Sequence, residues 1–400
     1  MGSAGQSITG YRVVIAGGGV AALEAALALR ELAEERVRLE LLAPEPDFWY
    51  RPLAVAEPFG VGQPARLALV DFARECEAQV TLGALAAVRS DDHVAVSHAG
   101  AELCYDALLI ACGAAPRTAV PGAFTFRGPA DVPAFARLLE TLGRDVRSLA
   151  FAIPVQSTWT LPAYELALLT ASHLQSQHVR TVELQLVTPE EHPLGLFGSA
   201  ASEEIARLLA DRGIVLLTRA EAVAFSAGRL ELASGDSVQT DAVVALPRLE
   251  GIRIDGVPHD SDGFVDADRF GRVSELVDVY AAGDVTSFPI KQGGLAAQQA
   301  EAASETIAAA AGARVEPVPF DPVLRGLLLT GGIPRYLRAE LEQPGRSEMD
   351  ALSLWWPPSK IAGKYLAPFL AARHGDLLSA PPGVRAMHIE VGLAAEYRPV

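Results

Sequence analysis

The sequence has few cysteines and no thiol pair. Only Cys76, Cys104 and Cys112 occur among its 400 residues, and their spacing gives neither a C-x-x-C motif nor a disulfide framework. Unpaired cysteines of this kind are typical of a reducing compartment. We therefore expect a cytoplasmic protein that has no metal site.

Positive charge is also scarce. The chain has 33 basic and 49 acidic residues and a net charge of -16, and no basic run is present to follow a phosphate backbone. We expect no nucleic-acid partner. An acidic protein is repelled by anionic lipid as a whole, although a local basic amphipathic patch can still dock on a membrane.

Long apolar runs are missing as well. The N-terminus lacks the basic and apolar regions of a signal peptide. The most apolar long stretch, residues 150–169, contains Pro154, Gln156, Pro162 and Glu165. A bilayer-spanning helix needs about 20 predominantly apolar residues, so this stretch is interpreted as a buried strand followed by the start of a helix.

What the chain does have is enough apolar material for a large core. Half of its residues are hydrophobic and 20% are charged, as in globular proteins. Its length exceeds the size at which one core usually stops growing. We expect two domains and a terminal extension.

A glycine-rich turn follows the first apolar strand. Residues 12–16 predict a strand, and Gly17, Gly18 and Gly19 lead into a helix rich in Ala, Leu and Glu over residues 21–33. Glycines let a backbone turn sharply and approach a pyrophosphate, which the helix N-terminus stabilises. Ala22 takes the third small position, where the helix packs on the strand.

The second strand, residues 37–42, ends without the acidic residue that commonly binds an adenosine ribose. Ala43 and Pro44 occupy that place, and Glu45 comes just beyond. Glu45 is either a substitute ribose ligand or a solvated loop carboxylate.

Two further apolar strands end in glycine turns. Residues 107–111 lead to Gly113, and residues 277–281 lead to Gly283 and Asp284, ahead of a helix predicted from about 294 to 311. These motifs and the first glycine turn, in this order, resemble the FAD-dependent pyridine nucleotide-disulfide oxidoreductase superfamily.

The resemblance implies an α/β fold with two Rossmann-like domains of the glutathione-reductase type and a C-terminal cap. Residues 9–116 and 256–315 would form a discontinuous FAD-binding domain. Residues 117–255 would form a second domain similar to an NAD(P) domain, and residues 316–400 the cap or interface segment.

The resemblance also implies the residues that hold FAD. Gly17 and Gly19 would line the pyrophosphate, and Asp284 would hydrogen-bond a ribityl hydroxyl. Cys112 replaces the threonine of an ATG-like segment and is expected to pack, because a redox role needs a partner thiol. The full expected FAD set is Gly17, Gly19, Ala22, Glu45, Arg51, Ala111, Cys112, Gly113, Gly283, Asp284, Gly294 and Leu295.

Within the superfamily, the segments at residues 50–53 and 294–299 resemble type II NADH dehydrogenases and sulfide:quinone reductases. In those families the second segment begins a helix beneath the flavin, whose N-terminus stabilises negative charge on the reduced ring. Lys291 would add to that effect and is one of the expected catalytic residues. Gln298 and Gln299 are either a polar helix face or quinone contacts.

A second glycine loop is expected near residue 160 and is absent. Residues 148–153 predict its strand, and the helix that follows places Thr158, Thr160 and Ala163 at the glycine positions. Side chains there keep the backbone away from a pyrophosphate, which argues against tight NAD(P)H binding. Sulfide oxidation by a thiol relay is also disfavoured, because no cysteine lies near Trp159 or after Cys112.

Glu165, at the start of the same helix, is the second expected catalytic residue. It is either a proton relay to the flavin or quinone, if burial raises its pKa, or a carboxylate that stabilises the helix N-terminus.

Prolines at 317, 319 and 322 mark a linker, and aromatic and basic residues follow near Trp355 and Lys364. The resemblance leaves a choice of roles for this C-terminal segment. It packs over the flavin or at a homodimer interface, or it makes peripheral contact with the inner face of a membrane.

The sequence therefore predicts an FAD-dependent oxidoreductase that takes electrons from an unidentified small-molecule donor and passes them to an acceptor, for which a quinone is the leading candidate. Two alternatives remain open. One is a reductase that binds NAD(P)H through an atypical loop, and the other is a flavin-binding regulatory protein without turnover.

Overall fold

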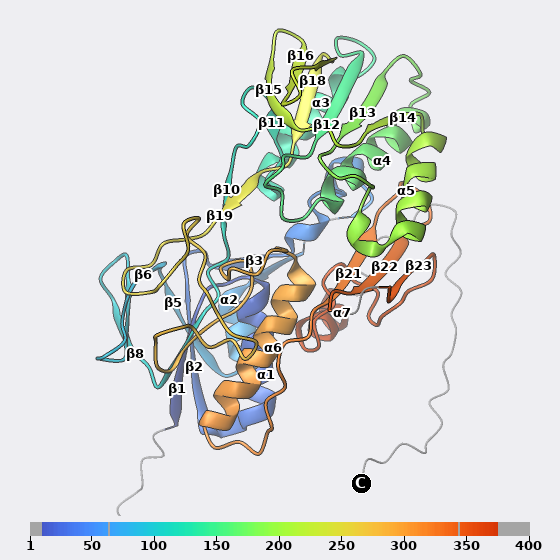
Figure 1. Ribbon diagram of the computed structural model, residues 1–400. Coiled ribbons are helices and arrows are strands. Elements are labelled where there is room, and N and C mark those ends of the chain that lie inside the picture. The colour runs from blue at the N-terminus through green and yellow to red at the C-terminus, as the bar shows by residue number, and fades with distance from the viewer. Residues whose placement is uncertain (1–9, 63–64, 343–344, 375–400) are drawn as a thin grey trace, which may run out of the picture.

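The computed structural model describes residues 10–62, 65–342 and 345–374, and its first sheet is parallel and five-stranded (Figure 1). The order of its strands is β20 (Val279–Ala281), β9 (Ala107–Ile110), β1 (Tyr11–Ala16), β2 (Val37–Ala43) and β5 (Ala78–Leu82).

Both faces of this sheet are covered. Side chains alternate along each strand, so neighbouring residues of β1 pack against different layers. Val13 and Ile15 pack with helices α1 (Val20–Ala33) and α6 (Gly293–Ala310). Val14 and Ala16 face the antiparallel strands β6 (Leu85–Arg89), β7 (Val94–Ser97) and β8 (Glu102–Cys104). The result is a layer of helices, a parallel sheet and an antiparallel layer.

The second sheet repeats this design. Its order is β11 (Phe124–Thr125), β18 (Ala242–Ala245), β12 (Ser148–Ala152), β13 (Glu183–Val187) and β14 (Ile214–Leu217). Its helices are α3 (Val132–Thr141), α4 (Leu161–Ser176) and α5 (Ser199–Asp211). Its antiparallel layer is β15 (Ala222–Ser226), β16 (Arg229–Leu232) and β17 (Ser237–Gln239).

The antiparallel pair of β10 (Ala115–Arg117) and β19 (Arg248–Glu250) lies where the chain passes between the two halves (Figure 1). The remaining elements of the first half are β3 (Asp47–Trp49), β4 (Arg66–Ala68) and α2 (Leu69–Glu75). Short 3-10 helices cover Glu34–Arg36, Arg51–Leu53, Glu57–Phe59, Pro129–Asp131 and Gly195–Phe197.

The C-terminal region touches both halves. Strands β21 (Val323–Leu328), β22 (Arg335–Glu340) and β23 (Ser347–Asp350) form an antiparallel sheet, and Leu324 and Leu337 join the core around α4 and α5. Helix α7 (Leu366–His374) instead packs Leu366 and Leu370 into the core around α1. The segment between β23 and α7 therefore crosses from one core to the other.

The two parallel sheets confirm the predicted α/β class with two Rossmann-like units. The domain boundaries given above remain predictions. Within the described residues, no helix is both long and apolar enough to cross a membrane.

Candidate functional site

The first glycine turn is shaped by a close backbone approach. Gly17 has a φ of +145°, and a Cβ there would lie 2.2 Å from the carbonyl oxygen of Ala111. Only glycine allows the end of β1 to lie this close to the end of β9. The turn that leads from β1 into α1 therefore needs glycine at this position.

Space for a ligand lies in front of that helix. A Cβ at Gly19 would meet no described atom within 4 Å, and among the described residues no side chain caps α1. Uncapped amides and the helix dipole stabilise an anion at this position. The turn and the open helix end therefore fit the pyrophosphate of a dinucleotide, and Ala22 packs fully buried behind them.

Cys112 fills the space between the ends of β1 and β9. Its Sγ donates to the carbonyl oxygen of Ala16 at 3.3 Å, and burial raises the pKa of the thiol to about 12. A neutral thiol is a poor nucleophile, so this environment is that of a packing residue. Gly113 follows with a φ of +73° and open space where a Cβ would be.

Asp284 lies three residues after the end of β20, at the wall of a cavity that both halves of the protein line. Burial raises the pKa of its carboxyl group, and the positive charges of Lys291 and Arg51 act in the opposite direction. The Nζ atom of Lys291 lies 3.8 Å from the centre of the Phe264 ring and donates to the carbonyl oxygen of Thr286. Burial lowers the pKa of Lys291 to about 8.

The helix that follows begins at the same cavity. Gln292 caps α6 by accepting a hydrogen bond from the Leu295 amide at 2.9 Å. Gln299 accepts one from the Gly283 amide at 2.8 Å, and Gln298 both donates to and accepts from the backbone of Val323. Both glutamines that the sequence left open are thus engaged by the protein itself.

The remaining expected residues lie at two places in the first half. Glu45 is exposed on the loop after β2, near the place where a ribose ligand would stand. Gly294 and Leu295 are buried in the first turn of α6.

The cavity itself has a volume of about 270 Å³ and lies where both halves and the C-terminal region meet. Apolar side chains form much of its wall, including Phe126, Trp159, Leu161, Leu246 and Leu327. Its charged and polar lining is Arg51, Arg127, Ser157, Thr158, Glu165, Asp284, Lys291, Gln292 and Lys360.

Glu165 and Lys360 form an ion pair at this cavity. Lys360 Nζ lies 2.7 Å from Oε1 and 2.6 Å from Oε2 of Glu165, and the Leu329 amide donates to Oε1 at 2.9 Å. The side chains of Lys360 and Glu165 are 6% and 0% exposed, respectively. Burial raises the pKa of Glu165, and Lys360 and the Leu329 amide oppose that change. Lys360 was not identified as a site residue in the sequence analysis. The one feature that sets it apart in the sequence is its positive charge directly after an apolar, proline-containing stretch.

The second loop, between β12 and α4, is closed by side chains. Thr160 Oγ1 donates to Oε1 of Glu190 at 3.1 Å, and Tyr164 Oη donates to Oε2 at 2.6 Å. Thr188 Oγ1 also donates to Oε2, at 2.9 Å. Glu190 follows β13, where a Rossmann domain commonly places the carboxylate that binds a ribose. In this chain the carboxylate accepts hydrogen bonds from hydroxyl groups of the protein itself.

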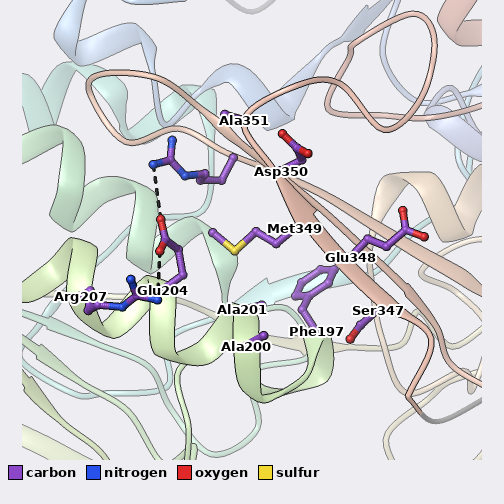
Figure 2. A pocket seen from close by; sticks show the side chains of 11 residues that line it. Phe197, Ala200, Ala201, Glu204, Arg207, Ser347, Glu348, Met349, Asp350 and Ala351 are labelled. Atoms are coloured by element: carbon purple, nitrogen blue, oxygen red, sulfur yellow. Dashed lines mark hydrogen bonds and ion pairs between the residues drawn. The ribbon is translucent and has the colours of Figure 1, made fainter.

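A separate hollow of about 480 Å³ lies between α5 and β23 (Figure 2). Phe197, Ala201 and Met349 line its apolar side. Arg335 and Arg207 each pair with Glu204 at its wall, Glu348 and Asp350 also line it, and none of the expected site residues does. The cavity at Glu165 is therefore the candidate site.

Comparisons with known proteins agree with this geometry. The sequence profile described as pyridine nucleotide-disulphide oxidoreductase matches residues 11–306. No curated protein sequence matches the chain.

Among solved structures, the chain is similar to the sulfide:quinone oxidoreductase of Aquifex aeolicus, with a TM-score of 0.76 and 18% identity over 94% of this chain and 100% of that one. A ferredoxin reductase from Rhodopseudomonas palustris has a TM-score of 0.62 and 17% identity over 82% of this chain and 81% of its own. An NAD-dependent persulfide reductase from A. fulgidus also has a TM-score of 0.62 and 17% identity, over 82% and 64% of the two chains.

Proposed function

We propose that this chain, which belongs to the pyridine nucleotide-disulphide oxidoreductase family, reduces a quinone with electrons from a donor other than a free nicotinamide nucleotide. The family makes the protein an FAD-dependent oxidoreductase. The identities of the donor and the acceptor are our proposal.

Bound FAD supplies the two-electron chemistry of this reaction. The chain supplies the binding groups. The turn at Gly17 and Gly19 and the N-terminus of α1 would hold the pyrophosphate, and Asp284 would hold the ribityl chain. Lys291 and the N-terminus of α6 would stabilise negative charge where the ring lies.

The buried pair of Glu165 and Lys360 carries the proposal for the acceptor. Reduction of a quinone to a quinol consumes two protons, and the apolar side chains of the cavity wall cannot supply them. A carboxyl group and an ammonium group in direct contact are able to hold and pass a proton at the cavity wall. The apolar wall around Trp159 and Leu327 suits the ring of a quinone. The similar structure from Aquifex aeolicus is a sulfide:quinone oxidoreductase, which is in keeping with this acceptor.

The closed second loop supports the proposal for the donor. A nicotinamide nucleotide would have to displace Thr160 and Tyr164 from Glu190 and find a pyrophosphate site without glycines. Sulfide is disfavoured as a donor for a different reason, because oxidation by a thiol relay needs cysteines near the flavin. Among the described residues the cysteines are Cys76, Cys104 and Cys112, and none of them lines the cavity.

Membrane access is proposed for the segment before Lys360. Leu352 and Trp356 are 75% and 85% exposed, the two highest values among the large apolar side chains of the described residues. A lipid-borne quinone would reach the cavity if this segment rested on a membrane surface.

One experiment tests both halves of the proposal. The purified FAD protein is mixed anaerobically with NADH, NADPH or sulfide while flavin absorbance is followed. In a second sample the flavin is reduced with light and then mixed with a water-soluble quinone. We expect slow bleaching by all three donors and rapid reoxidation by the quinone. Rapid bleaching by NADH or NADPH would disprove the donor half, and reoxidation no faster than in buffer would disprove the acceptor half.

A further inference from the structure

The segment that carries Lys360 is fixed at several points. We call residues 359–366 the strap. Its Lys360 meets Glu165 of α4, and the Ile361 amide donates to Tyr50 Oη at 2.9 Å. Since Tyr50 belongs to the first half and Glu165 to the second, the strap bridges the two halves at the cavity.

The far end of the strap is gripped by carboxyl groups from two helices. Glu24 of α1 is completely buried and accepts hydrogen bonds from the amides of Tyr365 and Leu366, each at 2.8 Å. Glu301 of α6 accepts one from the Lys364 amide at 3.0 Å. Amides at the start of a helix have no partner within the helix, so the two carboxyl groups satisfy the start of α7.

Gly363 allows the strap to lie this close to α1. A Cβ at that residue would lie 2.3 Å from Oε2 of Glu24. Any larger residue would push the strap away from Glu24, and Lys360 is only three residues upstream. Contacts at the far end therefore govern where Lys360 lies.

The two carboxyl groups also affect each other's pKa. Glu24 and Glu301 are hydrogen-bonded to each other, and burial together with the charge of Glu301 raises the pKa of Glu24 to about 8. Burial also raises the pKa of Glu301, which Lys364 and Arg325 oppose. The pair titrates as a unit. The charged and titratable groups that face it or its immediate neighbours are Lys364, Tyr365, Arg325, Glu31 and Glu305.

We infer that Glu24 and Glu301 are positioning residues for the reaction, because they clamp the strap so that Lys360 meets Glu165 in the cavity. Neither carboxyl group is among the described residues that line the cavity, so both act through the strap. The inference rests on the proposed function for the role that Lys360 plays. The clamp is measurable without any turnover.

The first test measures the clamp itself. Amide hydrogen exchange of residues 359–366 is followed in the FAD-loaded protein at pH 6.5. Glu24→Gln removes one of two acceptor oxygens and Gly363→Ala disturbs the clamp from the strap side, so both should speed exchange about tenfold. Glu35→Gln, at an exposed residue of the short 3-10 helix that follows α1, is the control and should stay within about twofold. Exchange at the wild-type rate in both clamp variants would overturn the inference.

The second test asks whether the clamp acts through Lys360. Reoxidation of photoreduced flavin by a soluble quinone is measured for Glu24→Gln, Lys360→Met and the double variant. Glu24→Gln should slow the reaction about threefold or more alone, and hardly at all when Lys360 is already replaced. Equal effects in both backgrounds would show that Glu24 acts independently of Lys360 and would overturn the inference.

The two proposals fail in different ways. If Lys360→Met leaves quinone reduction unchanged, the proposed function loses its proton relay, and the positioning role fails with it even if the strap has loosened. If Lys360→Met slows the reaction while both clamp variants keep wild-type exchange and rates, only the positioning inference fails.

Discussion

Glu165 and Lys360 are 195 residues apart in the chain, yet the Nζ atom of Lys360 lies within hydrogen-bond distance of both carboxylate oxygens of Glu165. The pair joins α4 of the second half to the strap that precedes α7. Because both side chains are almost fully buried, the contact fixes two distant regions of the chain at the cavity wall and places ionisable groups where the acceptor would bind.

Removal of one partner from this pair should destabilise the protein. Lys360→Met leaves Glu165 as a buried carboxylate without its cation, which typically costs about 3–5 kcal/mol of unfolding free energy. The double variant Glu165→Gln with Lys360→Met should recover some of this loss. Denaturant unfolding of the FAD-loaded protein measures both values.

The matched control for this prediction is the exposed pair of Arg74 and Asp71, 2.8 Å apart on α2. Replacing Arg74 with Ala should change the unfolding free energy little, because water screens an exposed ion pair. A Lys360→Met protein as stable as the wild type would show that the buried pair contributes no net interaction.

Gly17 and Gly19 should respond differently to the same substitution. Gly17→Ala forces a Cβ onto the Ala111 carbonyl oxygen at a φ of +145° and should destabilise the fold by at least about 3 kcal/mol. Gly19→Ala points its methyl group into open space and should leave the FAD-free protein nearly as stable as before. It should nevertheless weaken FAD binding about tenfold or more, since that space is where the pyrophosphate would lie.

Thermal unfolding of the FAD-free proteins and fluorescence titration with FAD separate the two effects. Normal FAD affinity in Gly19→Ala would place the pyrophosphate elsewhere.

The features that the sequence predicts well are those that a short stretch of residues determines. A strand that ends in glycines produces its turn wherever it occurs, so the first sheet and its turns follow from short stretches of sequence. The fold class was confirmed on this basis. The same holds for the loop at Thr160, whose missing glycines are visible without a structure.

Residues that depend on tertiary contacts were missed. Glu24 is one of two glutamates in the alanine-rich helix α1, and only the strap, more than 300 residues away, explains why it is buried. Lys360 has its partner on α4, and Glu190 has hydroxyl partners from Thr160 in the loop before α4 and from Tyr164 in α4. Strands β22 and β23 lie at residues 335–350. No local pattern predicts them, because their pairing with β21 determines their register.

Tyr164→Phe tests the closed second loop. The substitution removes the hydroxyl group that lies 2.6 Å from Glu190, so the part-buried carboxylate loses a donor and the protein should lose about 1–3 kcal/mol of unfolding free energy. Flavin reoxidation by quinone should be unchanged, because Tyr164 is not among the described residues that line the cavity. Bleaching by NADH should stay slow, because the glycines are still missing. A large gain in the NADH rate would show that the Tyr164 hydroxyl alone keeps the nucleotide out.

Lys291 should add to the pH dependence that the flavin midpoint potential already has from proton uptake. Its pKa is lowered to about 8 by burial, so the ammonium group is largely charged at pH 6.5 and largely neutral above pH 9. A positive charge near the ring stabilises the reduced flavin and raises its potential. Lys291→Met should therefore lower the potential by about 30 mV at pH 6.5, equivalent to about 1.4 kcal/mol for two electrons.

The effect of Lys291 on the potential should decrease with rising pH, because burial lowers the pKa of its ammonium group. A lysine whose pKa is lowered in the folded state loses its proton within the working range of the protein, so its contribution falls as the pH rises through about 8. The potentials of the wild type and Lys291→Met should thus converge above pH 9, as measured by anaerobic dye-coupled titration. Arg12→Met serves as a control, because Arg12 is half exposed and pairs with Asp106 at the start of the first sheet; its potential should match the wild type at every pH. A constant difference between wild type and Lys291→Met from pH 6.5 to 9 would show that the lysine acts without titrating, and no difference at all would place its charge away from the flavin.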